Sequence, residues 1–300
     1  MGNYVLTLGE SLIDVVPSEN GPVGHPGGSA LTTSVGLGRL GREVFFGTWF
    51  GTDAGGQMIR KHLDASHVKI LPGSDNAPKT TTASVSFDAK GTASYTFDLC
   101  IDIPPIPGNL SPLAVHTGSL GAFLPDAGPK ILDYVRSLAG PTITFDPNIR
   151  PAVMGSHAQT VRIAEAYVET ADVVKVSSED LEHLYPGRSI WESARAWSDA
   201  GTALVLLTLG ADGAAAITPG AEPVFSAKPS GSVADTIGAG DTFMAATIHW
   251  LWEDGLLGQP LDLDAQQCSD LLAFASRAAA ITVSRVGGDP PWLAELEFKS

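Results

Sequence analysis

Long apolar runs, basic residues and cysteines are all scarce in this 300-residue sequence, and each shortage excludes a class of protein. No segment reaches the roughly 18 unbroken apolar residues that a membrane-spanning helix needs. Lys and Arg number 18 against 33 Asp and Glu, which gives a formal net charge of −15. Nucleic acids and anionic membranes bind clustered cations, so we expect neither as a partner. The acidity still allows an anionic substrate, because backbone N–H groups bind phosphate without any basic side chain.

The N-terminus and the cysteines indicate a cytoplasmic protein. The first residues, Met1 to Tyr4, lack the basic region and the apolar stretch of a secretory signal. Cys100 and Cys268 lie far apart and form no metal-ligand spacing. We therefore expect two unreactive thiols in a reducing compartment.

Several common nucleotide-binding motifs are missing as well. No Gly-Lys pair occurs, which excludes a P-loop, and the protein-kinase strings Asp-Phe-Gly and His-Arg-Asp are absent. The segment Gly36–Gly41 matches the G-x-G-x-x-G pattern of dinucleotide-binding proteins. It falls near the end of a helical pattern and precedes a strand, whereas that motif follows a strand. We interpret these glycines as helix packing and a helix stop, which argues against a dehydrogenase.

Short apolar runs alternate with amphipathic stretches along the whole chain, without a repeat or an evident linker. This alternation predicts one α/β domain over residues 1–300, with a doubly wound, mainly parallel sheet and helices on both faces. The expected strands are Val5–Leu8, Val44–Thr48, Thr142–Phe145, Val173–Val176, Ala203–Leu207 and Ala214–Ile217. The expected helices include Gly56–Ala65, Ala127–Ala139, Ile190–Ala200 and Ser269–Val283.

One region departs from this pattern. The runs Thr80–Phe87 and Ala93–Phe97 alternate polar and apolar residues around Asp88-Ala89-Lys90-Gly91, which is a hairpin pattern. Together with the stretch around Ile13–Val23, this hairpin predicts a small β-sheet that projects from the body. We expect a lid formed by residues 13–25 and 80–98, although an ordinary edge hairpin fits the same pattern.

The most informative segment is Asp235–Thr242, which reads D-T-I-G-A-G-D-T. It precedes a helical pattern, so its small residues leave successive N–H groups open at the start of a helix, where anions bind. A carboxylate at Asp241 would repel a bound phosphate, but it suits a base that takes a proton from a hydroxyl attacking phosphorus. A glycine-rich turn with Asp241 as a plain helix cap would explain a bare G-x-G-D. The full eight-residue string is much more specific.

These residues make the sequence similar to the ribokinase-like (PfkB) family of carbohydrate kinases. Asp235–Asp241 resembles the C-terminal signature of that family, D-T-x-G-A-G-D. Gly27–Leu31, with the helical stretch that ends at Gly41, resembles its N-terminal signature. Gly9–Asp14 resembles the opening of fructokinase-type members. Further matches follow in the order of the family, at Phe145–Pro151, Lys175–Leu181 and Thr208–Gly213.

The resemblance implies residues for catalysis and for sugar binding. Asp241 is the implied catalytic base. The implied anion hole for the transferring phosphoryl group consists of Gly238, Ala239 and Gly240. The implied substrate-binding residues are Asp14, Gly27, Gly28, Thr32 and Arg150. Without the family match, each of these would read as part of a turn, a cap or the surface.

The resemblance also implies ATP, Mg²⁺ and K⁺ as cofactors. The implied nucleotide-binding residues are Lys175, Ser177, Thr208, Gly210, Gly213 and Ser276. Asp180 would act on Mg²⁺ through water, since Mg²⁺ keeps several waters when few carboxylates bind it. Asp235 would help to bind the monovalent cation. On chemistry alone, Asp180 is equally an acidic residue at a helix N-terminus.

Several positions depart from the family pattern. Thr32 stands where relatives carry an Asn that contacts the sugar, and a hydroxyl offers fewer hydrogen bonds than an amide. Asp180 is one methylene shorter than the usual Glu, and Ser276 replaces an Asn near the adenine. After the second lid strand, acid-sugar kinases that resemble this chain tend to have Tyr and Arg, whereas this chain reads Tyr95-Thr96-Phe97-Asp98-Leu99. Asp98 would repel a substrate carboxylate, which favours a neutral sugar over 2-keto-3-deoxygluconate.

The sequence therefore predicts an ATP-dependent kinase that phosphorylates a hydroxyl of a small neutral sugar by in-line transfer, in the manner of a fructokinase or ribokinase. A nucleoside kinase or a 2-keto-3-deoxygluconate kinase of the same family stays an alternative. A non-catalytic sugar-binding regulatory protein is the alternative outside enzymes, because a fold does not fix a function. The family also implies a homodimer formed through the lid.

Overall fold

The computed structural model describes residues 2–18, 21–87, 93–227 and 232–297, and within them one large sheet has nine strands. Their spatial order is β13 (Val224–Phe225), β12 (Ala214–Ile217), β11 (Leu204–Thr208), β10 (Val173–Ser177), β9 (Thr142–Asp146), β8 (Ala114–Gly118), β1 (Val5–Leu8), β4 (Val44–Gly47) and β5 (Val68–Ile70). All neighbours from β11 to β5 pair in parallel, and β12 and β13 add an antiparallel edge. The mainly parallel sheet is as predicted.

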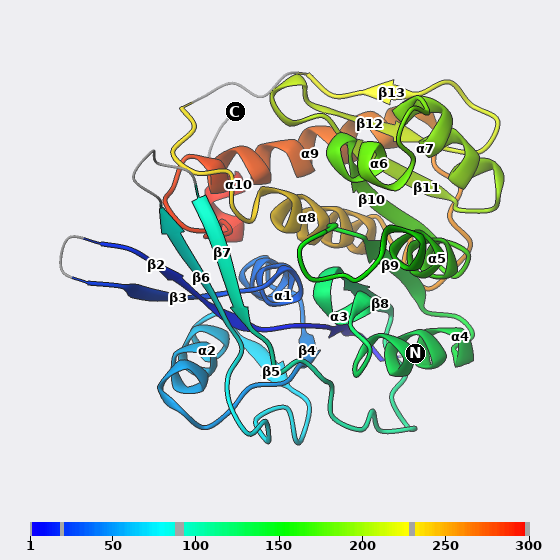
Figure 1. Cartoon of the computed structure of the whole chain (residues 1–300). Coiled ribbons are helices and arrows are strands. Elements are labelled where there is room, and N and C mark those ends of the chain that lie inside the picture. Colours follow the sequence, from blue (N-terminus) through cyan, green and yellow to red (C-terminus); the bar gives the residue numbers. More distant parts are fainter. Residues whose placement is uncertain (1, 19–20, 88–92, 228–231, 298–300) are drawn as a thin grey trace.

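Helices cover both faces of this sheet (Figure 1). One face packs against α1 (Ser29–Arg39), α2 (Ala54–Ala65), α8 (Ala239–Glu253) and α9 (Ala265–Val283). The other packs against α3 (Ser119–Phe123), α4 (Gly128–Ser137), α5 (His157–Val168), α6 (Ser178–Leu184) and α7 (Ile190–Asp199). A last helix, α10 (Leu293–Glu297), follows near the C-terminus. No helix within the described ranges is both long and apolar enough to cross a membrane.

The strands read as unbroken apolar runs because they are buried on both faces. In β11, Leu204 and Leu206 join the apolar cluster beneath α8 and α9, whereas Val205 and Leu207 join the cluster beneath the helices of the opposite face. This alternation explains why such runs lack the polar positions of a half-exposed strand.

A second, smaller sheet projects from the body (Figure 1). Its order is β3 (Val23–Gly27), β2 (Leu12–Val16), β6 (Thr82–Phe87) and β7 (Ala93–Asp98). The two predicted hairpin strands pair antiparallel, and β2 joins them through a parallel pairing with β6. The predicted small sheet is thus confirmed, while the predicted turn at residues 88–91 lies outside the described residues.

The glycines of Gly36–Gly41 have the packing role predicted for them. A Cβ at Gly36 would lie 2.7 Å from the Cβ of Ala245, so the missing side chain lets α1 approach α8 closely. Gly38 packs against the carbonyl oxygen of Ser66. Gly41 has φ +79°, which suits a residue that ends a helix.

Strand order also determines where a ligand can bind. From β1 the chain continues to β4 and β5 on one side, and later returns to β8, β9, β10 and β11 on the other. The crevice beyond the carboxyl ends of such strands, near the point where the order reverses, is the usual ligand site of open α/β sheets. Glu10 follows β1, and Asp146 and Ser177 end β9 and β10 at this edge.

Candidate active site

The N-terminus of α8 provides open N–H groups for an anion. Gly238 caps the helix with φ 74°, a left-handed conformation that favours glycine. The first N–H groups of a helix have no intrahelical acceptor, and only Ala239 among the predicted anion-hole residues donates to a nearby carbonyl, that of Thr236 at 3.4 Å, within the described residues. Gly238, Ala239 and Gly240 therefore lie at an open helix start of the kind that binds anions, and their role as an anion hole stays a prediction.

A second glycine supports this turn, and the sequence analysis missed it. A Cβ on Gly238 would lie 2.8 Å from Cα of Gly288 and 3.2 Å from Cγ2 of Thr32. Asp235 Oδ2 accepts a hydrogen bond from Gly287 N–H at 3.0 Å. The segment after α9 thus braces the anion-binding turn, and the pair Gly287-Gly288 was the available sequence signal.

Asp241 lies in the first turn of α8 and is partly exposed. Its Oδ1 accepts a hydrogen bond of 2.6 Å from the hydroxyl of Ser29, the first residue of α1. Burial raises the pKa of Asp241, while the Ser29 hydrogen bond and the positive charges of Lys175 and Arg150 lower it; the net direction is upward. A carboxylate with a raised pKa is a better proton acceptor, as a general base requires.

Lys175 brings a positive charge to the anion-binding turn. Its Nζ lies 2.8 Å from Oδ2 of Asp146, and both side chains are at least 95% buried. A Cβ on Gly240 would lie only 2.6 Å from that Nζ, so the ammonium group faces the backbone of the anion site directly. The Asp146 carboxylate holds the pKa of Lys175 above its usual value despite burial, so the side chain stays charged.

Asp14 lies on β2 of the small sheet. Burial raises its pKa to about 6, helped by the negative charge of Asp241 and opposed by His25 and Arg150. Its carboxyl leans over Gly27, where it leaves no room for a side chain. Asp14 is therefore close enough to Asp241 and Arg150 for their charges to interact, and its role in sugar binding stays a prediction.

Glu10 is a buried carboxylate that the sequence analysis did not single out. It accepts hydrogen bonds from the N–H groups of Ser29, at 2.8 Å, and Gly121, at 2.9 Å, and so caps α1 and α3 at once. Burial raises its pKa to about 7. The signal that would have found it is its position: an acidic residue two positions after the end of the buried strand β1.

The predicted metal-side residues have structural partners. Asp180 forms a capping box with Ser177 at the start of α6, and its Oδ1 accepts from Ile149 N–H at 2.8 Å. Both oxygens of Asp180 are thus engaged, so its role toward Mg²⁺ stays a prediction. Among the described residues no group of three or more His, Cys, Asp or Glu side chains is arranged to hold a metal ion.

Four of the predicted nucleotide-binding residues lie at the end of β11, in the loop that follows it and on α9. Thr208 ends β11, and the loop to β12 contains Gly210 (φ 59°) and Gly213 (φ 96°) around a short 3₁₀ turn, Gly210–Asp212. A Cβ on Gly213 would lie 2.8 Å from the hydroxyl oxygen of Ser226. Ser276 lies on α9, which packs against β12 and β13. The roles of these residues toward ATP stay predictions.

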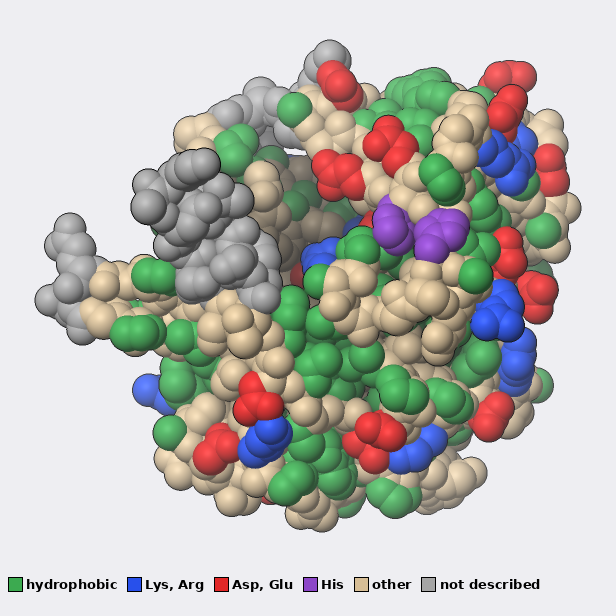
Figure 2. Space-filling view, in the orientation of Figure 1, with side chains coloured by type: hydrophobic (Ala, Val, Ile, Leu, Met, Phe, Trp, Pro, Cys, Tyr) green, Lys and Arg blue, Asp and Glu red, His purple; other side chains and the backbone are tan. Residues whose placement is uncertain are grey.

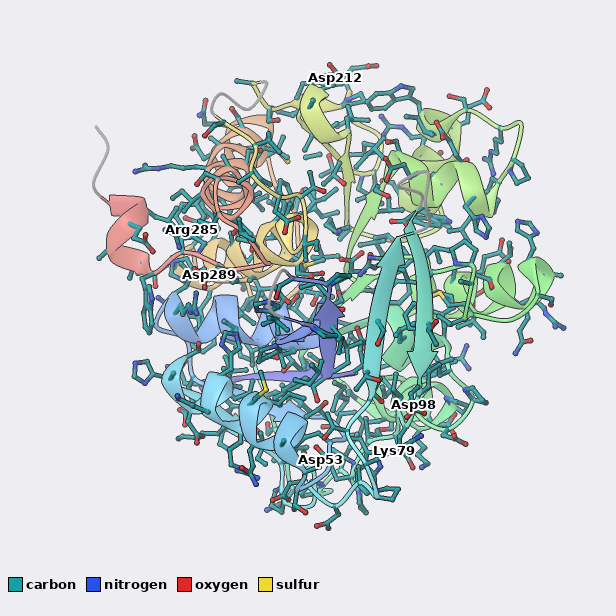
Figure 3. All side chains as sticks on the ribbon, turned by 60° about the vertical axis from the view of Figure 1, so that its left-hand side comes forward. Asp53, Lys79, Asp98, Asp212, Arg285 and Asp289 are labelled. Carbon is teal, nitrogen blue, oxygen red and sulfur yellow. The ribbon has the colours of Figure 1, made fainter. Side chains whose placement is uncertain are left out.

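The charge of Asp98 is paired, contrary to the expectation that it would repel a substrate carboxylate. Asp98 forms a salt bridge with Lys79, and the two side chains are 61% and 47% exposed. Figure 3 shows the pair together where β7 ends, close to Asp53 at the start of α2. Because Lys79 neutralises its charge, Asp98 gives no reason to exclude an acidic substrate.

Figure 2 shows a hollow between the projecting sheet and the body, with side chains of both charge signs within it. Electrostatic interactions link Asp14, Asp146, Arg150 and Lys175 to Asp241. Carboxylates suit hydroxyl donors, and the open N–H groups with Lys175 suit a phosphoryl group. The arrangement can therefore hold an alcohol next to a phosphate.

The raised pKa of Glu10 predicts a pH-dependent stability. A carboxyl whose pKa is raised from 4.5 to about 7 on folding stabilises the folded state fully below pH 4.5 and loses that contribution as the pH rises through 7. The wild-type free energy of unfolding should fall between pH 5 and 7, by up to about 1 kcal/mol per pH unit from this group. Denaturant unfolding at several pH values measures it.

In the variant Glu10→Gln the slope of stability against pH should be smaller, because a neutral side chain no longer titrates. Asp199→Asn, which changes an exposed carboxyl on α7, is the matched control and should keep the wild-type slope. An unchanged slope in Glu10→Gln would show that Glu10 does not titrate in this range.

Comparisons with known proteins find relatives over most of the chain. The family model described as pfkB family carbohydrate kinase matches residues 3–294. A fructokinase from Rhizobium leguminosarum bv. trifolii is 31% identical over 281 residues, which cover 87% of this chain and 84% of that protein. The crystal structure of a fructokinase with bound ATP from Xylella fastidiosa superposes with a TM-score of 0.83 at 23% identity, covering 99% of this chain and 98% of the other. That of aminoimidazole riboside kinase from Salmonella enterica, complexed with aminoimidazole riboside and an ATP analog, gives 0.82 at 25% identity, covering 98% and 99%.

Proposed function

The chain belongs to the pfkB family of carbohydrate kinases, and from this premise we propose that it transfers the γ-phosphoryl group of ATP to a hydroxyl of a small neutral sugar. One observation carries the proposal. A proton acceptor, Asp241, lies at the same helix start as the open N–H groups of Gly238–Gly240 and the ammonium group of Lys175. That combination meets the needs of phosphoryl transfer, in which positioning and charge stabilisation supply most of the catalysis.

The sugar binds between Asp14, Gly28 and the small sheet in this proposal. Carboxylates accept hydrogen bonds from sugar hydroxyls, and Asp14 with Asp241 would repel a carboxylate on the substrate. The negative charges of Asp14 and Asp241, and not that of Asp98, are therefore the reason to expect a neutral sugar. The fructokinase relative favours a ketose such as fructose, and the riboside kinase neighbour makes a nucleoside-like substrate the main competitor.

The chemical step is an in-line displacement. The sugar hydroxyl loses its proton to Asp241, its oxygen forms a bond to the γ-phosphorus, and the bond from that phosphorus to the bridging oxygen of ADP breaks. The N–H groups of Gly238–Gly240 and the charge of Lys175 stabilise the phosphoryl oxygens as this occurs. Each such donor contributes on the order of 3 kcal/mol in comparable oxyanion sites.

The residues present fit a phosphate-bound magnesium ion better than an all-protein metal site. The described residues hold no cluster of metal ligands, and Mg²⁺ is commonly held by one or two carboxylates together with substrate phosphates and water. Such an ion supplies charge neutralisation on the phosphates. Asp180 would contact it through water, and Asp235, which braces the turn before Gly238, would help to hold K⁺.

The small sheet acts as a lid in this proposal, and a homodimer forms through it. Closure over the sugar would exclude water and so limit hydrolysis of ATP. Thr32, whose Cγ2 lies near the Gly238 turn, and Arg150, whose charge reaches both Asp14 and Asp241, would complete the sugar contacts.

Replacing Asp14 by Ala should raise the KM for the sugar roughly tenfold or more, because one charged hydrogen-bond acceptor is worth about 1.5–3 kcal/mol. The KM for ATP should change less than about twofold, since Asp14 lies on the sugar side of the transferring group. Steady-state kinetics with each substrate varied in turn measure both constants. Equal effects on both would assign Asp14 a structural role.

Coupled detection of ADP tests the function itself. The purified protein is incubated with Mg²⁺, K⁺ and ATP against fructose, ribose, other neutral sugars, 2-keto-3-deoxygluconate and nucleosides. Turnover with a neutral sugar supports the proposal, and preferential turnover of a nucleoside would replace the sugar by that class. Thermal stabilisation by a sugar without any turnover would favour a sugar-binding regulatory protein.

A further inference from the structure

Ser29 connects the two helices that carry the active site. It is the first residue of α1 and only 7% exposed, and its hydroxyl reaches Asp241 on α8, 212 positions away in the sequence. Hydrogen bonds from a hydroxyl to a carboxylate are typically 2.5–2.7 Å long and strong. The 2.6 Å separation from Oδ1 falls in that range.

The backbone of Ser29 is fixed by a hydrogen bond to Glu10 and by the turn at Gly28. Its N–H donates to Oε1 of Glu10 at 2.8 Å, and the preceding Gly28 adopts φ 106°, a conformation that L side chains rarely adopt. A Cβ at Gly28 would also lie 2.9 Å from the Glu10 carbonyl oxygen. The buried Glu10 carboxylate and the glycine turn therefore fix the direction of the Ser29 side chain.

The hydrogen bond from Ser29 makes the two oxygens of Asp241 unequal. Oδ1 accepts from Ser29, whereas Oδ2 makes no hydrogen bond within the part of the chain that the structure describes. A carboxylate that must receive a proton benefits from a fixed orientation, because a misplaced acceptor loses much of its rate advantage.

We propose that Ser29 is a positioning residue for phosphoryl transfer: its hydroxyl occupies Oδ1 of Asp241 and so presents Oδ2 to the attacking hydroxyl of the sugar. This rests on the proposed function, in which Asp241 is the base. The sugar proton moves to Oδ2, and Ser29 keeps its own proton while donating to Oδ1 before and after the transfer. The same hydrogen bond also stabilises the ionised form of Asp241.

A merely structural Ser29 would hold α1 against α8 and nothing more. Its loss would then lower stability without changing how the base titrates. A positioning role predicts a change in kcat with little change in either KM, together with a shift in the pH profile. Since the Ser29 hydrogen bond lowers the pKa of Asp241, its removal should move the acidic limb of kcat to higher pH.

The experiment compares Ser29→Ala, Ser29→Thr, Asp241→Asn and the double variant Ser29→Ala/Asp241→Asn with the wild-type enzyme, using the best sugar and Mg²⁺-ATP between pH 5.5 and 9. Ser29→Ala should lower kcat roughly tenfold, with both KM values within about twofold. Ser29→Thr, which keeps the hydroxyl, should restore most of the activity. In the Asp241→Asn background, Ser29→Ala should cause no further loss, because the two residues act as one unit.

Wild-type kcat and an unshifted acidic limb in Ser29→Ala would overturn the proposal. So would an equal loss from Ser29→Ala with and without Asp241, since the effect would then not act through the base. If Ser29→Thr does not fold, the comparison of Ser29→Ala in the two backgrounds still decides. Failure of the proposed function looks different: the wild type would transfer no phosphoryl group, or Asp241→Asn would remain active.

Discussion

Replacing Asp241 by Asn should lower kcat by roughly two orders of magnitude or more, the contribution typical of a positioned general base. Asn has nearly the same shape, and its amide oxygen can accept the Ser29 hydrogen bond, so folding should change little. The lost property is the ability to receive a proton. Steady-state kinetics and thermal unfolding of the same preparations separate these two effects.

Burial raises the pKa of Asp241, so the wild-type activity should decline toward acid at a higher pH than an ordinary aspartate would give. The base must be ionised to act, and therefore kcat falls as the pH drops through its pKa. Asp199→Asn, which changes an exposed carboxyl at the end of α7, is the control variant and should keep the wild-type kcat and pH profile. Near-normal kcat in Asp241→Asn would remove Asp241 from the role of base.

Replacing Lys175 by Met should lower kcat about a hundredfold, in line with the loss of one preorganised group that stabilises the transferring charge. The side chain keeps its approximate length and loses its charge beside Gly240. The KM for the sugar should stay nearly constant, because Lys175 lies on the phosphoryl side of the site. Kinetics with ATP and sugar varied separately measure the difference.

Lys175→Met also leaves the Asp146 carboxylate buried without its partner, which typically costs 3–5 kcal/mol of stability. The double variant Lys175→Met/Asp146→Asn removes both charges and should recover much of that stability while kcat stays low. Lys130→Met, which breaks the exposed pair with Asp102, is the matched control and should leave kcat unchanged. Recovery of kcat in the double variant would show that Lys175 acts only through folding.

The body of the fold follows from local pattern. The six predicted strands of the large sheet are all present, because strands buried on both faces appear as short unbroken apolar runs. Gly36–Gly41 was distinguished from a nucleotide-binding loop by its position near the end of a helical pattern, and its glycines indeed pack against Ala245 and Ser66. The small sheet was predictable from the alternation in its hairpin.

The residues that hold the site in place do so through contacts between segments that are distant in the sequence. Such contacts cannot be predicted from the local pattern of apolar and polar residues. Ser29 meets Asp241, and Gly288 meets Gly238, only because α1 and the segment after α9 pack at the start of α8. The sequence predicts a strand that ends next to Asp146. It does not predict the ion pair with Lys175, because that pair forms only when β9 and β10 lie side by side. Asp98 was misjudged for the same reason, since its partner Lys79 lies before the other strand of the hairpin.

The most direct test of the account is detection of the phosphorylated sugar itself. The wild-type protein and Asp241→Asn are incubated side by side with Mg²⁺-ATP and fructose, and the products are followed by phosphorus NMR. The account predicts a sugar phosphate that appears with ADP in equal amounts for the wild type and at least a hundredfold more slowly for the variant. Equal rates of sugar phosphate formation by both proteins would contradict it.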